Sequence, residues 1–130
     1  MEITSGMVQI PTVDGSMSGF TVLPQVAGNY PAIIVVQEAF GLNAHIKDVA
    51  ARLAREGYAT LAPDLYYREK DAVVGYDNLP DAIRLMMSLW DDKVVKDMGA
   101  AITYLQQQPS VRGDRIGVTG FCMGGRVTFL

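Results

Sequence analysis

The sequence predicts an α/β fold in which a mostly parallel sheet follows an N-terminal β-hairpin. Residues 32–36 form a continuous apolar run rich in β-branched side chains, which is typical of a strand covered on both faces. A helical pattern and a second apolar run at residues 58–62 follow, which is the order of a βαβ unit. Asp14-Gly15 lies between two earlier β-type runs, and this dipeptide is a strong hairpin signal.

The first half of the chain supplies the hairpin and the βαβ unit. The hairpin is expected to join residues 7–10 to residues 19–23, and a turn region follows at 24–29. Asn43 is suited to cap the N-terminus of the crossover helix, and Gly57 is suited to end it. The apolar stripe that predicts this helix consists of Ile46, Val49, Ala50 and Leu53.

The second half predicts a loop, two helices and a last strand. Residues 65–78 are irregular, and their aromatic side chains either pack over the sheet edge or line a pocket. Pro80 can open a helix that runs to Leu89, and Pro109 ends the next helix, at 93–107. The last strand is expected at 116–121. The inner face of the 93–107 helix is predicted to carry Val94, Val95, Met98, Ala101, Ile102 and Leu105.

Composition narrows the class of protein. The chain has 130 residues, and a hydrophobic content of 49% with 19% charged residues is that of one globular domain. A net charge of −3 without a basic run argues against a nucleic-acid partner, and no apolar stretch is long enough for a membrane span. No secretory leader is recognised, and the single cysteine fits a reducing cytoplasm. One cysteine and one distant histidine make a poor metal site, and no cofactor is expected.

The pattern Gly120-x-Cys122-x-Gly124 is that of a nucleophile elbow with cysteine in the serine position. Glycines two residues either side of the nucleophile relieve the crowding of a sharp strand-to-helix turn. Such a turn exposes the sulfur and aims the first free helix N–H groups, including that of Met123, at the group under attack. The alternative is a plain strand end that carries a buried cysteine.

Glu38 follows the buried run at 32–36 with only Gln37 between them. A carboxylate at the carboxyl end of a parallel strand lies where ligands bind in α/β sheets. The alternative is a loop carboxylate that faces water.

Several segments in the same order resemble the dienelactone hydrolase family of cysteine-dependent α/β-hydrolases, and the likeness runs from about residue 31 to residue 130. The resemblance implies that Cys122 is the nucleophile and that Glu38 contacts its thiol and helps it ionise. It also implies an oxyanion hole made by the backbone N–H groups of Ala39 and Met123. The implied reaction is attack on an ester or lactone, an acyl-enzyme intermediate and hydrolysis. The segments that carry the likeness are residues 33–38, 40–43, 57–59, 62–66 and 114–125.

The chain also departs from the family pattern. The family triad needs an aspartate and a histidine after the elbow, and the sequence ends eight residues past Cys122. Residues 1–130 are therefore expected to form a single incomplete α/β-hydrolase domain, which lacks its C-terminal strands and helices and shows little turnover alone. A C-terminal fragment or a second chain would complete the sheet. His45 is expected to be a surface helix residue that does not replace the missing histidine.

Family residues that bind the substrate carboxylate would fall near Leu79 and Ile83, and neither matches, so the family's usual substrate is not assigned. Two other functions compete with hydrolysis of a small ester or lactone. One is a non-catalytic α/β-hydrolase-like binding or assembly module. The other is a redox thiol protein based on Cys122.

Overall fold

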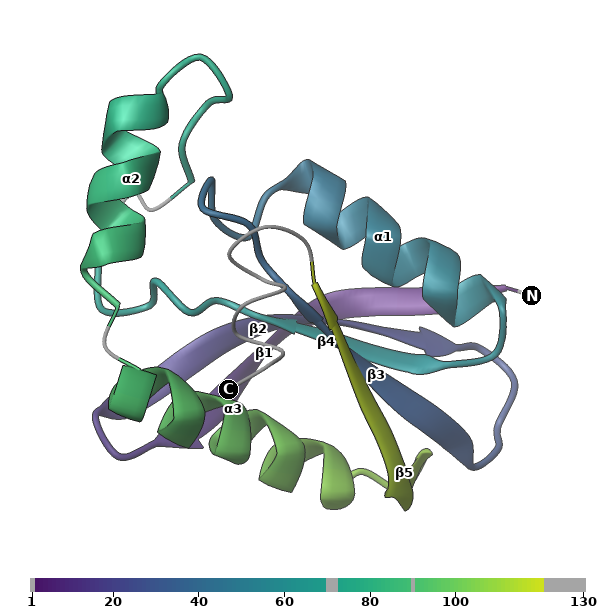
Figure 1. The fold of residues 1–130 in the computed structure, drawn as a ribbon. Coiled ribbons are helices and arrows are strands. Elements are labelled where there is room, and N and C mark those ends of the chain that lie inside the picture. The colour runs from purple at the N-terminus through teal and green to yellow at the C-terminus, as the bar shows by residue number, and fades with distance from the viewer. Residues whose placement is uncertain (1, 70–72, 90, 121–130) are drawn as a thin grey trace.

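A computed structural model describes residues 2–69, 73–89 and 91–120. The elements follow one another along the chain as a hairpin, a βαβ unit, two helices and a last strand (Figure 1). Their bounds are β1 Ile3–Thr12, β2 Gly15–Pro24, β3 Tyr30–Val36, α1 Ala44–Arg55, β4 Ala59–Pro63, α2 Leu79–Met87, α3 Asp91–Gln106 and β5 Val111–Gly120.

The described strands form one mixed sheet in the order β1-β2-β4-β3-β5. The hairpin supplies the antiparallel part, because β1 pairs with β2 and β2 with β4 in that sense. The parallel part is β4-β3-β5, and β3 lies at its centre. Within the described part of the chain, β5 pairs on one side only. This arrangement confirms the predicted combination of an α/β sheet with an N-terminal hairpin.

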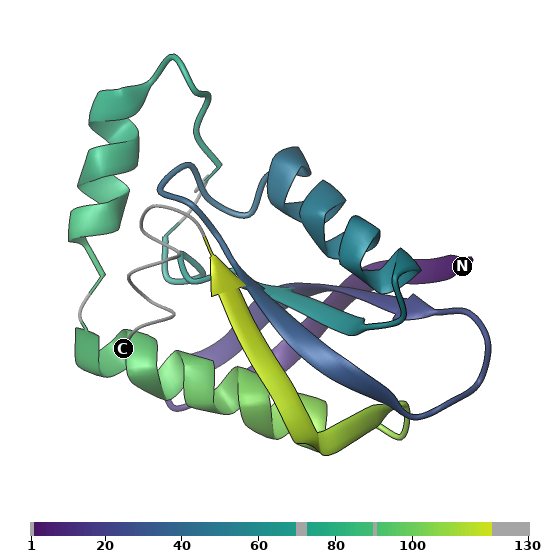
Figure 2. The ribbon, with the colours of Figure 1, turned by 45° about the vertical axis from the view of Figure 1, so that its right-hand side comes forward.

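Helices cover both faces of the sheet, with α1 on one side and α3 on the other (Figures 1 and 2). The side chains of β3 alternate between these faces. Val35 packs in the cluster under α1 with Ile46 and Ala50, whereas Ile34 packs in the cluster under α3 with Met98. Burial on both faces is the reason that residues 32–36 read as an uninterrupted apolar run.

The helix ends agree with the sequence signals. The Asn43 side chain accepts a hydrogen bond from the Ile46 N–H at 3.1 Å, so Asn43 is the N-cap of α1. Gly57 follows the end of α1 with φ +101°, a conformation that side-chain-bearing residues seldom adopt. Asn78 caps α2 in the same way as Asn43 caps α1.

Three expectations need correction. The hairpin strands are ten residues each, longer than the predicted runs, because the antiparallel ladder extends from Ile3 to Thr12. The last strand begins at Val111 rather than at residue 116, since Val111 pairs with Tyr30 before a register shift. Val95 lies on the predicted inner face of α3 but is 48% exposed, because the helix turns Asp97 inward instead.

Asp97 on α3 is the buried charge that the apolar pattern did not reveal. Only 1% of it is exposed, and its carboxylate accepts bonds from Arg68 Nη1 at 2.9 Å and Nη2 at 3.3 Å. Tyr67 Oη donates to the same carboxylate at 3.1 Å, and Arg68 also pairs with Asp14 of the hairpin turn. The group Asp14, Tyr67, Arg68 and Asp97, called the Arg68 clamp below, ties the loop after β4 to α3 and to the hairpin.

We expect Asp97→Ala to lower the free energy of unfolding by about 3 kcal/mol, because it leaves Arg68 and Tyr67 without their buried acceptor. Urea unfolding of the intact protein that contains these 130 residues measures the change. Asp48→Ala is the matched control: it breaks an exposed ion pair with Arg52 on α1 and should cost less than about 0.5 kcal/mol. Equal losses in the two variants would contradict a structural role for the clamp.

Candidate functional site

The carboxyl ends of β3 and β5 lie side by side at one edge of the sheet. Val36 of β3 pairs with Gly120 of β5, the last residue that the structure describes. Glu38 follows Val36 by two residues, and Cys122 follows Gly120 by two residues. Cys122 and Met123 lie outside the described residues, so the described part of the candidate site consists of Glu38, Ala39 and their neighbours.

Glu38 lies two residues after the end of β3, and its side chain is mostly buried. The side chain is 18% exposed, and its Oε1 lies 4.0 Å from Nε2 of His45 in the first turn of α1. The His45 side chain is 52% exposed, which agrees with the expected surface position on a helix. Its proximity to Glu38 was not predicted, and it results from the short connection between β3 and α1.

A tight turn fixes the backbone around Ala39. The Gly41 N–H donates to the Glu38 carbonyl at 3.1 Å, and Gly41 has φ +96°, which favours glycine. The Glu38 carbonyl and the Ala39 N–H belong to one planar peptide group and point in opposite directions. Within the described residues the Ala39 N–H has no hydrogen-bond partner, so the turn leaves a fixed and free donor next to Glu38.

The loop after β4 holds this turn from the other side. Gln37 is fully buried, and its Oε1 accepts a bond from the Leu65 N–H at 2.9 Å. Tyr66, which is 1% exposed, donates from its hydroxyl to the Ala39 carbonyl at 2.9 Å. The residues before and after Glu38 are therefore bonded to two consecutive residues of one loop.

These supporting contacts were missed at the level of sequence. Residues 62–66 were recognised as a family segment, but Tyr66 carried no signal that its hydroxyl reaches a backbone carbonyl 27 positions earlier. Gln37 next to Glu38 was the available hint, because a polar residue at the end of a buried strand needs hydrogen-bond partners. Its Nε2 has no partner of acceptable geometry in the described part of the chain.

The surroundings of Tyr66 keep its hydroxyl protonated. Burial raises the pKa of Tyr66 to about 12, and the Asp64 carboxylate adds to the rise while the nearby Gln37 side chain opposes it. Burial also raises the pKa of Asp64, which accepts a bond from the Tyr66 N–H at 3.0 Å. The Tyr66 hydroxyl therefore remains a donor throughout the neutral range.

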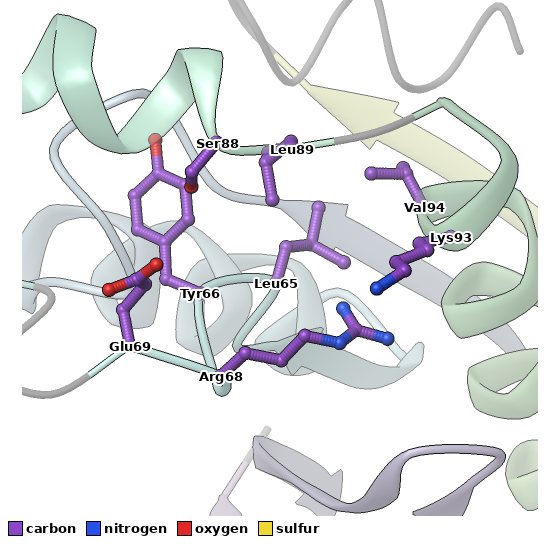
Figure 3. Close-up of a pocket in the computed structure, with 8 residues that line it drawn as sticks. All are labelled: Leu65, Tyr66, Arg68, Glu69, Ser88, Leu89, Lys93 and Val94. Atoms are coloured by element: carbon purple, nitrogen blue, oxygen red, sulfur yellow. The ribbon is translucent and has the colours of Figure 1, made fainter.

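Two depressions adjoin these residues. A groove of about 330 Å³ lies beside His45, and its lining is mainly apolar. A smaller pocket of about 90 Å³ lies between the loop after β4 and the start of α3 (Figure 3). Of these two depressions, the groove reaches the size of a small-molecule site and the pocket does not. The groove is lined by Asn43, Ala44, His45, Val73, Val74, Gly75 and Tyr76.

Neither metal binding nor a membrane span is indicated by what the structure describes. No cluster of three or more potential metal ligands occurs among residues 2–69, 73–89 and 91–120. In the same ranges, none of the helices combines the length and the apolar character that crossing a membrane requires.

The fold defines the class of the protein as an α/β-hydrolase. A crystal structure of a provisionally assigned dienelactone hydrolase from Klebsiella pneumoniae superposes with a TM-score of 0.89 at 34% identity, over 98% of this chain and 53% of that one. The dienelactone hydrolase-like promiscuous phosphotriesterase P91 from metagenomic libraries superposes with a TM-score of 0.82 at 30% identity, over 99% of this chain and 53% of that one.

The chain belongs to the Dienelactone hydrolase family, whose profile matches residues 17–130. A Methylorubrum extorquens protein provisionally named a carboxymethylenebutenolidase is 40% identical over 98% of this chain and 44% of its own length. A Bradyrhizobium protein provisionally named a 2-oxo-3-(5-oxofuran-2-ylidene)propanoate lactonase is 37% identical over 98% of this chain and 51% of its own. The chain thus spans about half the length of the curated relatives it matches.

The raised pKa of Tyr66 predicts a loss of stability in alkali. An unfolded tyrosine ionises near pH 10, whereas Tyr66 in the folded protein ionises at about 12. The contribution of Tyr66 to the free energy of unfolding is therefore fully present below pH 10 and is lost as the pH rises towards 12. Between pH 9 and pH 11 we expect the free energy of unfolding to fall by about 1 kcal/mol more than in Tyr66→Phe. Urea titrations of both proteins at the two pH values test this, and parallel losses would contradict it.

Proposed function

We propose that the intact protein hydrolyses small carboxylic esters or lactones through an acyl-enzyme on Cys122. In this proposal Glu38 contacts the thiol and helps it ionise, and the N–H groups of Ala39 and Met123 form the oxyanion hole. The observation that carries the proposal is the free, fixed N–H of Ala39 beside Glu38 at the carboxyl end of β3. Membership of the Dienelactone hydrolase family and the names of two relatives, a carboxymethylenebutenolidase and a lactonase, support it.

The strand register supports the partnership of the two halves of the site. Because Val36 and Gly120 are paired in parallel strands, the segments that continue from them start at the same edge of the sheet. Equal offsets from this pair to Glu38 and to Cys122 favour a short distance between carboxylate and thiol. The mainly apolar groove beside His45 is suited to the non-reacting part of an ester.

The proposed reaction uses each group at a separate step. The Cys122 thiolate attacks the carbonyl carbon and forms a C–S bond, while the π electrons move to oxygen. The backbone N–H groups stabilise this oxyanion until it collapses and the bond to the leaving oxygen breaks. The leaving oxygen takes up the proton that the thiol gave to Glu38 and departs as the alcohol. Water then adds to the thioester carbonyl, the C–S bond breaks, and the acid leaves with the Cys122 thiol restored. Only a few per cent of an ordinary cysteine is thiolate at neutral pH, so a base beside the sulfur increases the rate.

We further infer that the 130 residues form one incomplete hydrolase domain. The resemblance implies an aspartate and a histidine beyond the elbow, and we propose that they belong to a segment or second chain outside these residues. The same segment would pair with the open side of β5. A lone cysteine suits the reducing cytoplasm, which we propose as the compartment. The isolated 130-residue chain would then acylate slowly and fail to turn over.

Hydrolysis of p-nitrophenyl acetate by the intact protein tests the proposal. Cys122→Ala should abolish turnover, and Glu38→Gln should lower kcat/KM by about 100-fold, because the thiol loses the carboxylate that promotes its ionisation. Glu56→Gln, which changes an exposed carboxylate at the end of α1, is the matched control and should leave kcat/KM unchanged.

The outcome for Cys122→Ala separates the competing functions. Undiminished turnover in that variant would refute a cysteine nucleophile. A wild-type protein that neither turns over nor becomes acylated at Cys122 would favour the non-catalytic binding module. Mass spectrometry of the Cys122 peptide after mixing with the ester detects the acyl group directly.

A further inference from the structure

The geometry points to Tyr66 as a positioning residue that holds the oxyanion-binding N–H of Ala39 through the Ala39 carbonyl. This inference rests on the proposed hydrolase function and assigns a role to a residue that the elbow and the glutamate do not include. Its basis is the 2.9 Å hydrogen bond from the Tyr66 hydroxyl to Ala39 and the burial of the tyrosine.

Two peptide groups determine where the Ala39 N–H points. The first joins Glu38 to Ala39 and is held by the bond from the Gly41 N–H to the Glu38 carbonyl. The second joins Ala39 to Phe40, and its carbonyl is the acceptor for Tyr66. With both planes fixed, the torsion angles of Ala39 are fixed as well. Without the Tyr66 hydroxyl, the second plane can rotate about the Ala39 Cα–C bond. This rotation displaces the Gly41 N–H that holds the first plane, and so loosens the Ala39 N–H as well.

Tyr66 can hold the turn because its own loop is held. The Leu65 N–H donates to Gln37 at 2.9 Å, and the Asp64 side chain accepts from the Tyr66 N–H. The Arg68 clamp then ties the next two residues of the loop to the buried carboxylate of Asp97. Figure 3 shows the Tyr66 ring standing beside Ser88, with its hydroxyl directed away from the loop that carries Leu65 and Arg68.

The nature of the bond suits a role in positioning. No sequence signal for catalysis includes the Tyr66 hydroxyl, and this hydroxyl donates to a backbone carbonyl. A donor removed from an oxyanion hole costs about 10²- to 10³-fold in kcat, and a misdirected donor should cost less. We therefore expect about a tenfold effect on the steps in which an oxyanion develops.

The test compares two reactions of the same sulfur in the intact protein. Acylation by p-nitrophenyl acetate develops negative charge on the carbonyl oxygen, and the burst of p-nitrophenolate measures its rate. Alkylation by iodoacetamide forms a thioether and releases iodide without any oxyanion, and mass spectrometry of the Cys122 peptide measures its rate. Tyr66→Phe should slow acylation about tenfold, with KM unchanged, and leave alkylation at the wild-type rate.

Two further variants complete the experiment. Tyr30→Phe is the matched control, because it deletes a hydroxyl that donates to the Val26 carbonyl at 2.6 Å beside the other end of β3. It should change neither rate. Tyr66→4-aminophenylalanine keeps an N–H donor at the same ring position and should restore acylation. This variant also tests the inference if Tyr66→Phe folds poorly.

The possible failures are distinguishable. Acylation of Tyr66→Phe within twofold of wild type, with Cys122→Ala inactive, would overturn the inference and leave the proposed function intact. Parallel losses in acylation and alkylation would also overturn it, since the hydroxyl would then act on the thiol or on the fold. Ester hydrolysis by Cys122→Ala at the wild-type rate would mean that no acyl-enzyme on Cys122 is needed. That result would overturn the proposed function and the inference together.

Discussion

Backbone groups that leave a buried parallel strand must find hydrogen-bond partners, and this requirement shapes the carboxyl end of β3. The strand is covered by α1 on one face and α3 on the other, so the backbone groups near its carboxyl end are partly shielded from water. The Glu38 carbonyl is bonded within the tight turn, and the Ala39 carbonyl is bonded to Tyr66. Among the residues that the structure describes, the Ala39 N–H has no hydrogen-bond partner.

The same requirement joins distant parts of the chain. Gln37 and Ala39 are bonded to the loop after β4, and that loop is fixed by the Arg68 clamp to α3 and to the hairpin turn. A buried carboxylate such as Asp97 is tolerated because Arg68 and Tyr67 supply donors to it. The hairpin thus contributes more than two strands to the sheet, since Asp14 holds Arg68 from the exposed side.

The arrangement is consistent with a hydrolase that stabilises charge with backbone donors. Such donors are effective only when they are oriented before the reaction, because reorienting them during the reaction costs free energy. The tight turn, the buried tyrosine and the clamp all restrict the movement of one peptide group. The carboxylate of Glu38 and the preoriented N–H of Ala39 both lie at the carboxyl end of the parallel strand β3, the edge at which α/β sheets bind their ligands.

Most of the fold and part of the site could be predicted from the sequence, because their signals are local. The apolar run before Glu38, the cap at Asn43 and the glycine after α1 each determine a conformation within a few residues. The elbow spacing indicates Cys122 and Met123, and the family resemblance implies the roles of Glu38 and Ala39; these site assignments stay predictions. Only the tertiary structure decided that Asp97 turns inward and that the Tyr66 hydroxyl reaches Ala39. Those contacts join residues 27 or more positions apart, and their partners depend on how β4 and α3 pack rather than on any periodicity.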